Sequence, residues 1–291
     1  MLVSELVEEF VLEHKTRGSR AGTVDWYNRT LGLLLRTHWD LDRDALTRAT
    51  ITHLLAAGLE RGINPNTAAM YDRCLRAFCT WARGVGYLEV DPFQGRKRPA
   101  VRWEPRLVLT PVELDSLFHA AQDEKAYKER HRAILSLFVG LGLRAAEVAR
   151  LRVSDVDWDA ATLRIDGKTG YAVLPLDKST HRQLRRYVTH ERKSSGPALF
   201  VHQGQPLTAH SLSRLINRLG KRAGITRPIG PHLLRHTFAT LYLKAGGDTF
   251  TLQRLLRHAT AAMTTRYLHY QTDDLRSKLE ALSPLRGVGN R

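Results

Sequence analysis

The chain of 291 residues has only two cysteines and no apolar run long enough to cross a bilayer. Cys74 and Cys79 lie five residues apart in an expected helix, so they point to different faces and favour neither a disulfide nor a metal pair. The longest apolar run, residues 133–143, is typical of a buried helix. The acidic N-terminus, MLVSELVEEF, lacks the basic and apolar regions of a signal peptide. We therefore expect an intracellular protein with no membrane segment.

Acidic residues are also few relative to basic ones. The chain has 45 Lys+Arg against 29 Asp+Glu, a net charge of +16. Residues 1–100 carry 14 basic and 12 acidic residues, and residues 101–291 carry the remaining 31 and 17. The excess of positive charge in the second part favours a polyanionic partner such as nucleic acid.

Helical periodicity dominates the first ninety residues. Val3, Leu6, Val7, Phe10 and Val11 form one apolar stripe, and three further helices are expected over 23–37, 47–60 and 67–84. Four helices in this length predict a small all-helical domain over residues 1–92. An arginine-bearing face of the last helix is able to contact DNA despite the domain's weak net charge.

A proline-rich and basic segment, residues 93–109, is the expected domain linker. Such a basic run is either a solvated surface or a connector that follows a phosphate backbone. The candidate DNA contacts of the first domain and the linker are Arg73, Arg76, Arg96, Lys97, Arg98 and Arg102.

The remainder mixes helices with a short strand pair. Thr110 and Glu113 form a capping box that begins a helix. The pattern becomes strand-like over residues 162–176, with a turn expected at Asp166-Gly167 and Lys168 in or just after it. Helices are expected again over residues 179–193, 209–223, 232–245 and 249–257.

The stretch Pro231–Tyr270 gathers residues that suit chemistry on a phosphate. His232 and Arg235 share one helical face, and His258 and Tyr267 follow. A guanidinium matches phosphate with two parallel donors. His232 and His236 have the spacing of a zinc helix, but no glutamate lies between them and Arg235 opposes a divalent cation, so we expect no metal.

Taken singly, each candidate also has an ordinary structural interpretation. Arg144 and Glu147 are spaced as a surface ion pair, Lys168 suits a solvated turn, and Tyr267 suits a half-buried core position.

Taken together, these residues resemble the tyrosine site-specific recombinases of the phage integrase family, in their Xer-like form. LGLRAAEVARLRVSDVD is similar to the segment that carries the family's first catalytic arginine, and HLLRHTFAT and LLRHATAAMTTRYLH are similar to its later motifs. The nine-residue step from His258 to Tyr267 is the one the family uses. Residues 67–92 resemble the last helix of its core-binding domain, so the resemblance covers nearly the whole chain.

The resemblance implies a mainly α fold with a four-helix, SAM-like core-binding domain at 1–92. A mixed α+β catalytic domain with a small antiparallel sheet follows at 110–272. It also implies a site-specific DNA recombinase that works through a 3′-phosphotyrosyl intermediate and a Holliday junction. Neither metal, ATP nor another cofactor is needed, because the phosphotyrosyl bond conserves the energy for rejoining.

The resemblance also assigns residue roles. The implied catalytic set is Tyr267, Arg144, Lys168, His232, Arg235 and His258, with Glu147 supporting the structure around the arginines. Tyr267 attacks the phosphodiester. Arg144 and Arg235 hold the non-bridging oxygens, and Lys168 protonates the leaving 5′-oxygen. His232 accepts the tyrosine proton or orients the phosphate, and His258 donates to a phosphate oxygen.

Three departures from the family pattern stand out. Arg257 replaces the glycine of the family's Leu-Gly-His, which adds a cation near the site. Tyr171 and Ala172 replace basic residues after Lys168. Tyr270 is an alternative nucleophile on the face of Tyr267, although only Tyr267 satisfies the nine-residue step.

The resemblance further implies double-stranded DNA at specific sites as the partner, bound by a tetramer in the cytoplasm of a prokaryote, at the nucleoid. The tail, residues 273–291, has a leucine stripe that either packs on its own domain or is exchanged between protomers. No additional arm-binding domain is expected ahead of the helical domain. Two alternatives stay open: a type IB topoisomerase and a DNA-binding protein without catalysis.

Overall fold

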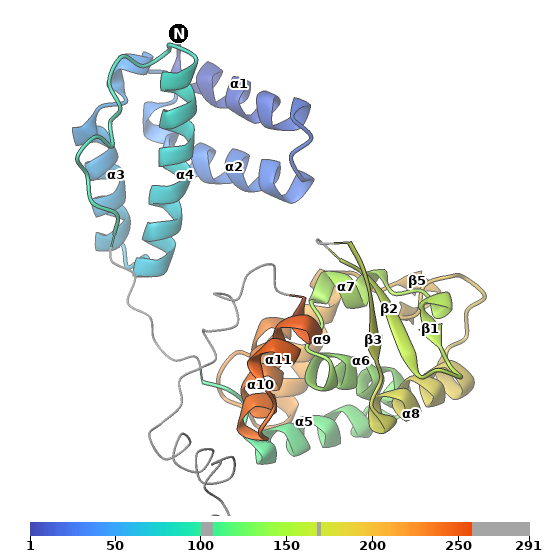
Figure 1. Ribbon diagram of the computed structural model, residues 1–291. Helices are drawn as coiled ribbons and strands as arrows, with labels where there is room; N and C mark the ends of the chain where they lie inside the picture. Colours follow the sequence, from blue (N-terminus) through green and yellow to red (C-terminus); the bar gives the residue numbers. More distant parts are fainter. Residues whose placement is uncertain (100–106, 168–169, 258–291) are drawn as a thin grey trace, which may run out of the picture. The chain divides into compact units, whose positions relative to one another are not determined.

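The structure is a computed structural model that describes residues 1–99, 107–167 and 170–257. The chain divides into two compact units, Met1–Pro105 and Arg106–Arg291 (Figure 1). Both units are mainly helical, and the strands form small antiparallel sheets. The predicted fold class is therefore confirmed. No helix within the described ranges is long and apolar enough to cross a membrane.

Over residues 1–99, the described part of the first unit has four α-helices with two 3₁₀ turns between the second and the third. Asn64 caps the last helix by accepting a hydrogen bond from the amide of Asn66, and Pro65 occupies the first helical position. The elements are α1 (Val3–Thr16), α2 (Ala21–Leu34), η1 (Arg36–His38), η2 (Arg43–Ala45), α3 (Arg48–Glu60) and α4 (Pro65–Gly84).

Aromatic rings fill the core of this unit. The ring of Phe10 lies 4.9 Å from that of Tyr27, 5.6 Å from that of Phe78 and 5.3 Å from that of Trp81, measured between centroids. Cys74 and Cys79 are free thiols within this core, and burial raises the pKa of each to about 12. Because a buried thiol with a raised pKa is a poor nucleophile, these two cysteines serve as packing groups in the core.

The second unit is larger and adds the strands. Its elements are α5 (Pro111–Asp123), α6 (Lys128–Gly140), α7 (Ala145–Arg150), η3 (Val153–Asp155), β1 (Val156–Asp157), β2 (Thr162–Gly167), β3 (Gly170–Pro175), α8 (Lys178–Arg186), the π-helical turn η4 (Tyr187–Glu191), β4 (Val201–His202), β5 (Gln205–Pro206), α9 (Ala209–Arg222), α10 (Pro231–Lys244) and α11 (Thr249–Leu256). The capping box predicted at Thr110 and Glu113 begins α5.

The three-stranded sheet has the order β1-β2-β3. The expected turn at Asp166-Gly167 is wrong, because both residues still belong to β2 and pair with Tyr171 and Gly170. Gly170 has a φ of +98°, which lets β3 begin immediately at the end of the hairpin. The strand pair is therefore longer at this end than the sequence pattern indicated.

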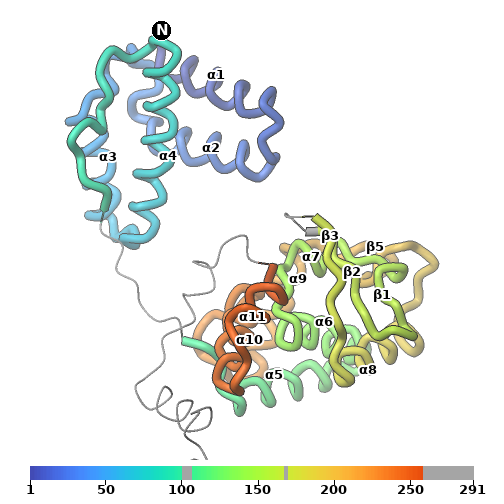
Figure 2. The backbone as a smooth tube through the Cα atoms, in the orientation of Figure 1, coloured from blue at the N-terminus to red at the C-terminus, as the bar shows by residue number. Residues whose placement is uncertain are grey.

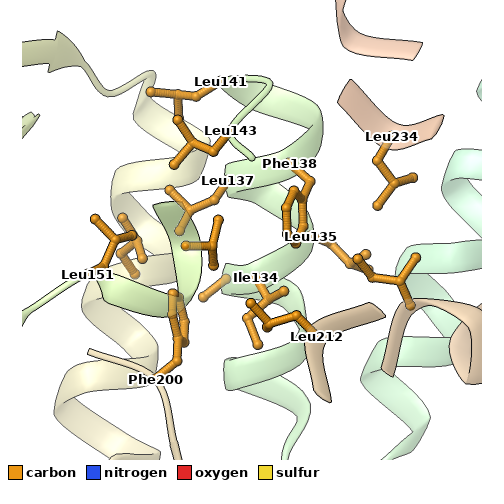
Figure 3. Packing of buried hydrophobic residues seen from close by; sticks show 14 of the residues in the cluster. Ile134, Leu135, Leu137, Phe138, Leu141, Leu143, Leu151, Phe200, Leu212 and Leu234 are labelled. Atoms are coloured by element: carbon orange, nitrogen blue, oxygen red, sulfur yellow. The ribbon is translucent and has the colours of Figure 1, made fainter. Parts of the chain in front are cut away.

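Helix α6 forms the centre of the core of the second unit. Its apolar side chains, among them Ile134, Leu137 and Phe138, are fully buried against neighbours from several elements (Figure 3). Leu151 and Phe200 pack on one side of this helix and Leu234 of α10 on another. A continuous aliphatic core therefore ties α10 to the rest of the unit.

The helix expected over residues 179–193 is shorter than predicted. The α-helix ends at Arg186, and a π-helical turn runs from Tyr187 to Glu191. In this arrangement the Glu191 carboxylate accepts hydrogen bonds from the amides of Glu129 and Arg130, at the start of α6. The π turn thus places an acceptor at a helix N-terminus that Tyr127 does not cap with its side chain.

Helices α10 and α11 form the last described part of the chain and pack on each other (Figure 2). Thr237 of α10 is fully buried, and its Oγ1 accepts a hydrogen bond from the amide of Leu109 at 3.0 Å. This bond fixes the start of the second unit to the helix that carries the predicted His-x-x-Arg motif.

Candidate active site

Arg144 is positioned by a tight turn between α6 and α7. Gly142 has a φ of +62°, and a Cβ atom there would lie 2.5 Å from Phe238 and 2.8 Å from Leu256. Only glycine therefore fits between this turn and the two C-terminal helices. Arg144 follows at the N-cap of α7 with its side chain 31% exposed.

Arg235 lies on the buried face of α10 and is 5% exposed. Its Nη1 donates to the carbonyl oxygen of Gly142 at 2.5 Å, and its Nη2 donates to that of Leu256 at 2.6 Å. The guanidinium therefore joins the turn before Arg144 to the end of α11. Two of its five N–H donors hold the fold, in a forked geometry that an ammonium lacks.

Glu147 lies between two guanidinium groups, with its side chain 2% exposed. Its Oε2 accepts the amide of Arg144 at 2.7 Å, and its Oε1 accepts Nη1 of Arg144 at 2.9 Å. Nη2 of Arg257 lies 2.5 Å from Oε2. Burial acts to raise the pKa of Glu147, but the Arg144 amide and the Arg257 charge outweigh it, so the pKa is lowered overall.

The ordinary interpretation of Arg144 and Glu147 as a surface ion pair is only half correct. The pair is present at 2.9 Å, but Glu147 is buried and has a second arginine as a partner.

His232 is exposed in the first turn of α10, after Pro231 at the first helical position. One helix thus carries an accessible imidazole and a buried guanidinium three residues apart.

The other predicted catalytic residues, Lys168, His258 and Tyr267, lie outside the described residues, as does Arg102. Lys168 follows Gly167, whose partner across the hairpin is Gly170. His258 follows Arg257 directly, so the chain enters this segment from the end of α11. Their roles, and those of Arg144, His232 and Arg235, stay predictions.

The candidate DNA contacts of the first unit fall into two groups. Arg73, Lys97 and Arg98 are exposed. Arg76 and Arg96 instead pair with Asp72, which is 2% exposed, at 2.8 and 3.5 Å. Nη2 of Arg76 also donates to the carbonyl of Arg96 at 3.1 Å, and both guanidinium groups lie over the ring of Phe93. These two arginines hold the start of the linker on α4.

The polar face of α9 is a surface that sequence reasoning did not single out. His210, Arg214, Arg218 and Lys221 are exposed along it and line a groove of about 420 Å³. The opposite face buries Leu212, Leu215, Ile216 and Leu219. Apolar spacing combined with basic residues on the other face is the signal that identifies such a helix.

Taken together, the described geometry suits an anionic, phosphate-like ligand. Arg144 is partly exposed, His232 is exposed, and hydrogen bonds from Arg235 and Glu147 fix the elements that carry them. Within the described ranges, no group of three or more His, Cys, Asp or Glu side chains is placed to hold a metal ion.

Comparison with known proteins identifies the family. The model of the phage integrase family matches residues 107–273. Tyrosine recombinase XerC of Xylella fastidiosa (strain 9a5c) is 31% identical over 97% of this chain and 98% of its own length. The chain belongs to the phage integrase family. Tyrosine recombinase XerD of Listeria innocua is 27% identical, over 92% of this chain and 93% of its own.

Solved structures show the same fold. The Tn1549 transposon integrase in complex with a circular intermediate DNA has a TM-score of 0.79 at 22% identity, covering 97% of this chain and 100% of that one. A lambda integrase dimer bound to a COC′ core site has a TM-score of 0.76 at 20% identity, covering 90% and 97%. The expectation of an Xer-like tyrosine recombinase that acts in site-specific DNA recombination is confirmed. These relatives favour neither the topoisomerase nor the silent DNA-binding protein.

Proposed function

We propose that this recombinase cuts and rejoins double-stranded DNA at specific sites through a 3′-phosphotyrosyl intermediate. Tyr267 attacks the phosphodiester and expels a 5′-hydroxyl, which Lys168 protonates. The 5′-hydroxyl of the partner strand then attacks the phosphotyrosyl bond and releases Tyr267. Exchange of both strand pairs proceeds through a Holliday junction.

In this mechanism Arg144 and Arg235 clamp the non-bridging oxygens of the phosphate while charge builds on them. His232 accepts the tyrosine proton or orients the phosphate, and His258 donates to a phosphate oxygen. The observation that carries the proposal is the pair of hydrogen bonds from Arg235 to the carbonyls of Gly142 and Leu256. These bonds bring together the turn before Arg144, the His-x-x-Arg helix and the helix that leads to His258.

The exposed cations favour contact with the phosphate backbone on both units. Arg73, Lys97 and Arg98 supply them on the first unit, and Arg214 and Lys221 on the α9 face of the second. Because each phosphate neutralised releases condensed counterions, this binding weakens as salt rises.

Assembly into a tetramer on two DNA sites is part of the same proposal. A groove of about 440 Å³ between β3 and α11 is lined by Val173, Phe250 and Leu255 among others. Val173 is 65% and Phe250 69% exposed, so this surface offers an apolar acceptor for the leucine-bearing tail, residues 273–291, of a neighbouring protomer. We place this assembly in the cytoplasm, where nucleoid DNA lies. Sedimentation on duplexes carrying the protein's site tests the stoichiometry.

The nucleophile is tested by trapping the covalent intermediate. The target site is first obtained by selecting bound duplexes from random DNA, and a nicked suicide duplex carrying that site is then incubated with the protein. We expect the wild type to form a covalent adduct and Tyr267→Phe to form none, since the variant lacks the attacking phenol oxygen.

Tyr270→Phe is the matched control, because it removes the other candidate phenol three residues away. Adduct formation by Tyr267→Phe but not by Tyr270→Phe would assign the nucleophile to Tyr270. Relaxation of a supercoiled plasmid without the selected site would point instead to a topoisomerase-like reaction.

A further inference from the structure

Arg257 adopts a backbone conformation that suits glycine. It ends α11 with φ 51° and ψ 49°, in the left-handed region. A non-glycine residue in this region carries a steric cost, which glycine avoids. The family pattern has glycine here, so the arginine carries a backbone cost that the family's usual residue avoids.

The side chain of Arg257 is directed inward and is 6% exposed. Its Nη2 lies 2.5 Å from Oε2 of Glu147, and its Nη1 donates to the carbonyl of Leu255 at 3.3 Å. The residues of the ion pair lie 110 positions apart in the sequence. The contact therefore joins the end of α11, directly before His258, to the helix that begins at Arg144.

Glu147 has two cationic partners that differ in their access to a ligand. Arg144 is 31% exposed, whereas Arg257 is 6% exposed. A DNA phosphate that reaches this corner is thus able to take hydrogen bonds from Arg144, while Arg257 stays with the carboxylate. Arg144 is thus placed to contact the ligand, and Arg257 to neutralise the buried charge of Glu147.

The energetic consequence concerns the moment when Arg144 turns to the phosphate. Nη1 of Arg144 must then loosen its bond to Oε1 of Glu147. Without a second cation, that step would leave the buried carboxylate with the Arg144 amide but no cationic partner, and breaking a buried ion pair is strongly unfavourable. With Arg257 in place, Glu147 keeps a charged partner throughout.

We propose that Arg257 is a positioning residue that holds the Glu147 carboxylate so that Arg144 is released to clamp the DNA phosphate. The inference rests on the phosphate-binding role proposed for Arg144. It adds a third arginine that acts on the reaction through Glu147.

The first test is a set of charge-changing variants in single-turnover cleavage of the nicked duplex carrying the selected site. We expect Arg257→Gln to cleave about 10- to 100-fold more slowly, because Arg144 is then held by an otherwise unpaired carboxylate. Affinity for the same duplex should stay within about twofold, since Arg257 is buried and other cations supply most of the backbone contact. Arg257→Lys keeps the charge and should recover most of the rate.

The decisive variant is the double substitution Glu147→Gln with Arg257→Gln. It removes the carboxylate together with its buried partner, so Arg144 is no longer held by Glu147 and the cleavage rate should rise above that of Arg257→Gln.

Arg186→Gln is the matched control, because it removes another arginine that pairs with a buried glutamate, Glu129, at 3.0 Å. It should leave the cleavage rate unchanged. Thermal melts of every variant ensure that rates are compared well below each midpoint.

Two results would overturn the inference: wild-type cleavage by Arg257→Gln, or a double variant no faster than the single one. An NMR arm separates it from the proposed function. The Nε–H signal of Arg144 is assigned by its absence in Arg144→Lys. This signal should shift when the selected duplex is added to the wild type, and should not shift when the duplex is added to Arg257→Gln. If this pattern is seen while the wild type forms no covalent adduct, the proposed chemistry fails and the inference stands; if the signal does not shift in the wild type, the inference fails.

Discussion

The two units of the molecule are stabilised by different kinds of interior. The core of the first is built from aromatic and aliphatic side chains, and among its described residues the buried polar ones are Thr30 and Asp72. The catalytic unit has a larger aliphatic core but also buries Glu129, Arg130, His131, Glu147 and Arg235. The unit that carries the predicted catalytic residues is therefore the one that buries several charged side chains.

This difference separates two sources of stability. Burial of aromatic and aliphatic side chains does not itself depend on pH. Buried ions depend on every partner, since one left unpaired costs several kcal/mol. In the catalytic unit, the buried guanidinium of Arg235 and the buried carboxylate of Glu147 are both held by such partners. The predictions below test this division, beginning with the largest effect.

Removing one ring from the first unit should produce the largest loss of stability. Phe78 is fully buried, with its ring centroid 5.6 Å from that of Phe10 and 6.1 Å from that of Trp81. Phe78→Ala should cost about 3–5 kcal/mol of unfolding free energy, because it deletes packing and leaves a cavity. Urea denaturation followed by tryptophan fluorescence measures it.

Leu33→Ala serves as the control for Phe78→Ala, because Leu33 is 64% exposed on α2. The loss caused by Phe78→Ala should be the same at pH 7.5 and pH 5.5. A loss that depends strongly on pH would mean that charge, rather than ring packing, stabilises this unit too.

In the catalytic unit, keeping the charge but changing its geometry should abolish most activity. Arg235→Lys cannot reach the carbonyls of Gly142 and Leu256 together or present a forked pair of donors. We expect cleavage of the nicked duplex to fall about 10²- to 10³-fold, the effect of losing one transition-state donor. Arg150→Lys, at an exposed arginine that also donates to a backbone carbonyl, should cleave normally. Near-wild-type cleavage by Arg235→Lys would refute the clamp.

Local features of both units were predictable because their signals lie within a few residues. The capping box at Thr110 and Glu113 and the helix over Pro231–Lys244 are examples. The family motifs likewise placed Arg144 and Arg235 in the candidate site. The comparisons confirm the family, and residue roles remain to be tested by the variants above.

Contacts between distant segments were not predictable from spacing. The Arg257–Glu147 pair spans 110 residues, and Arg235 reaches a carbonyl 93 residues away. Arg76 and Arg96 were predicted as DNA contacts from the sequence, which gave no sign that both also pair with the buried carboxylate of Asp72. Nor does the sequence pattern show the π turn at Tyr187–Glu191, which depends on the start of α6.

The smallest effect expected is the acid sensitivity that His131 gives to the catalytic unit. His131 is fully buried, with Nδ1 3.1 Å from Oε2 of Glu124 and Nε2 3.1 Å from Nη2 of Arg130. Since Arg130 donates to Nε2, that nitrogen is an acceptor and the ring is neutral, with Nδ1 facing the Glu124 carboxylate. Burial, together with the nearby charges of Arg130, Arg218 and Arg222 and the ring of His202, lowers the pKa of His131 to about 3.

Between pH 6.5 and 3, His131 is protonated in the unfolded chain but stays neutral in the folded unit. Stability therefore falls as pH drops, by up to about 1.4 kcal/mol per pH unit from this group. Urea midpoints of the wild type at pH 7.5, 6.0 and 5.0 measure the slope. His131→Gln should flatten it, whereas His119→Gln, at an imidazole 70% exposed, should leave it unchanged. An unchanged slope in His131→Gln would assign the acid sensitivity to other groups and weaken the contrast between the two interiors.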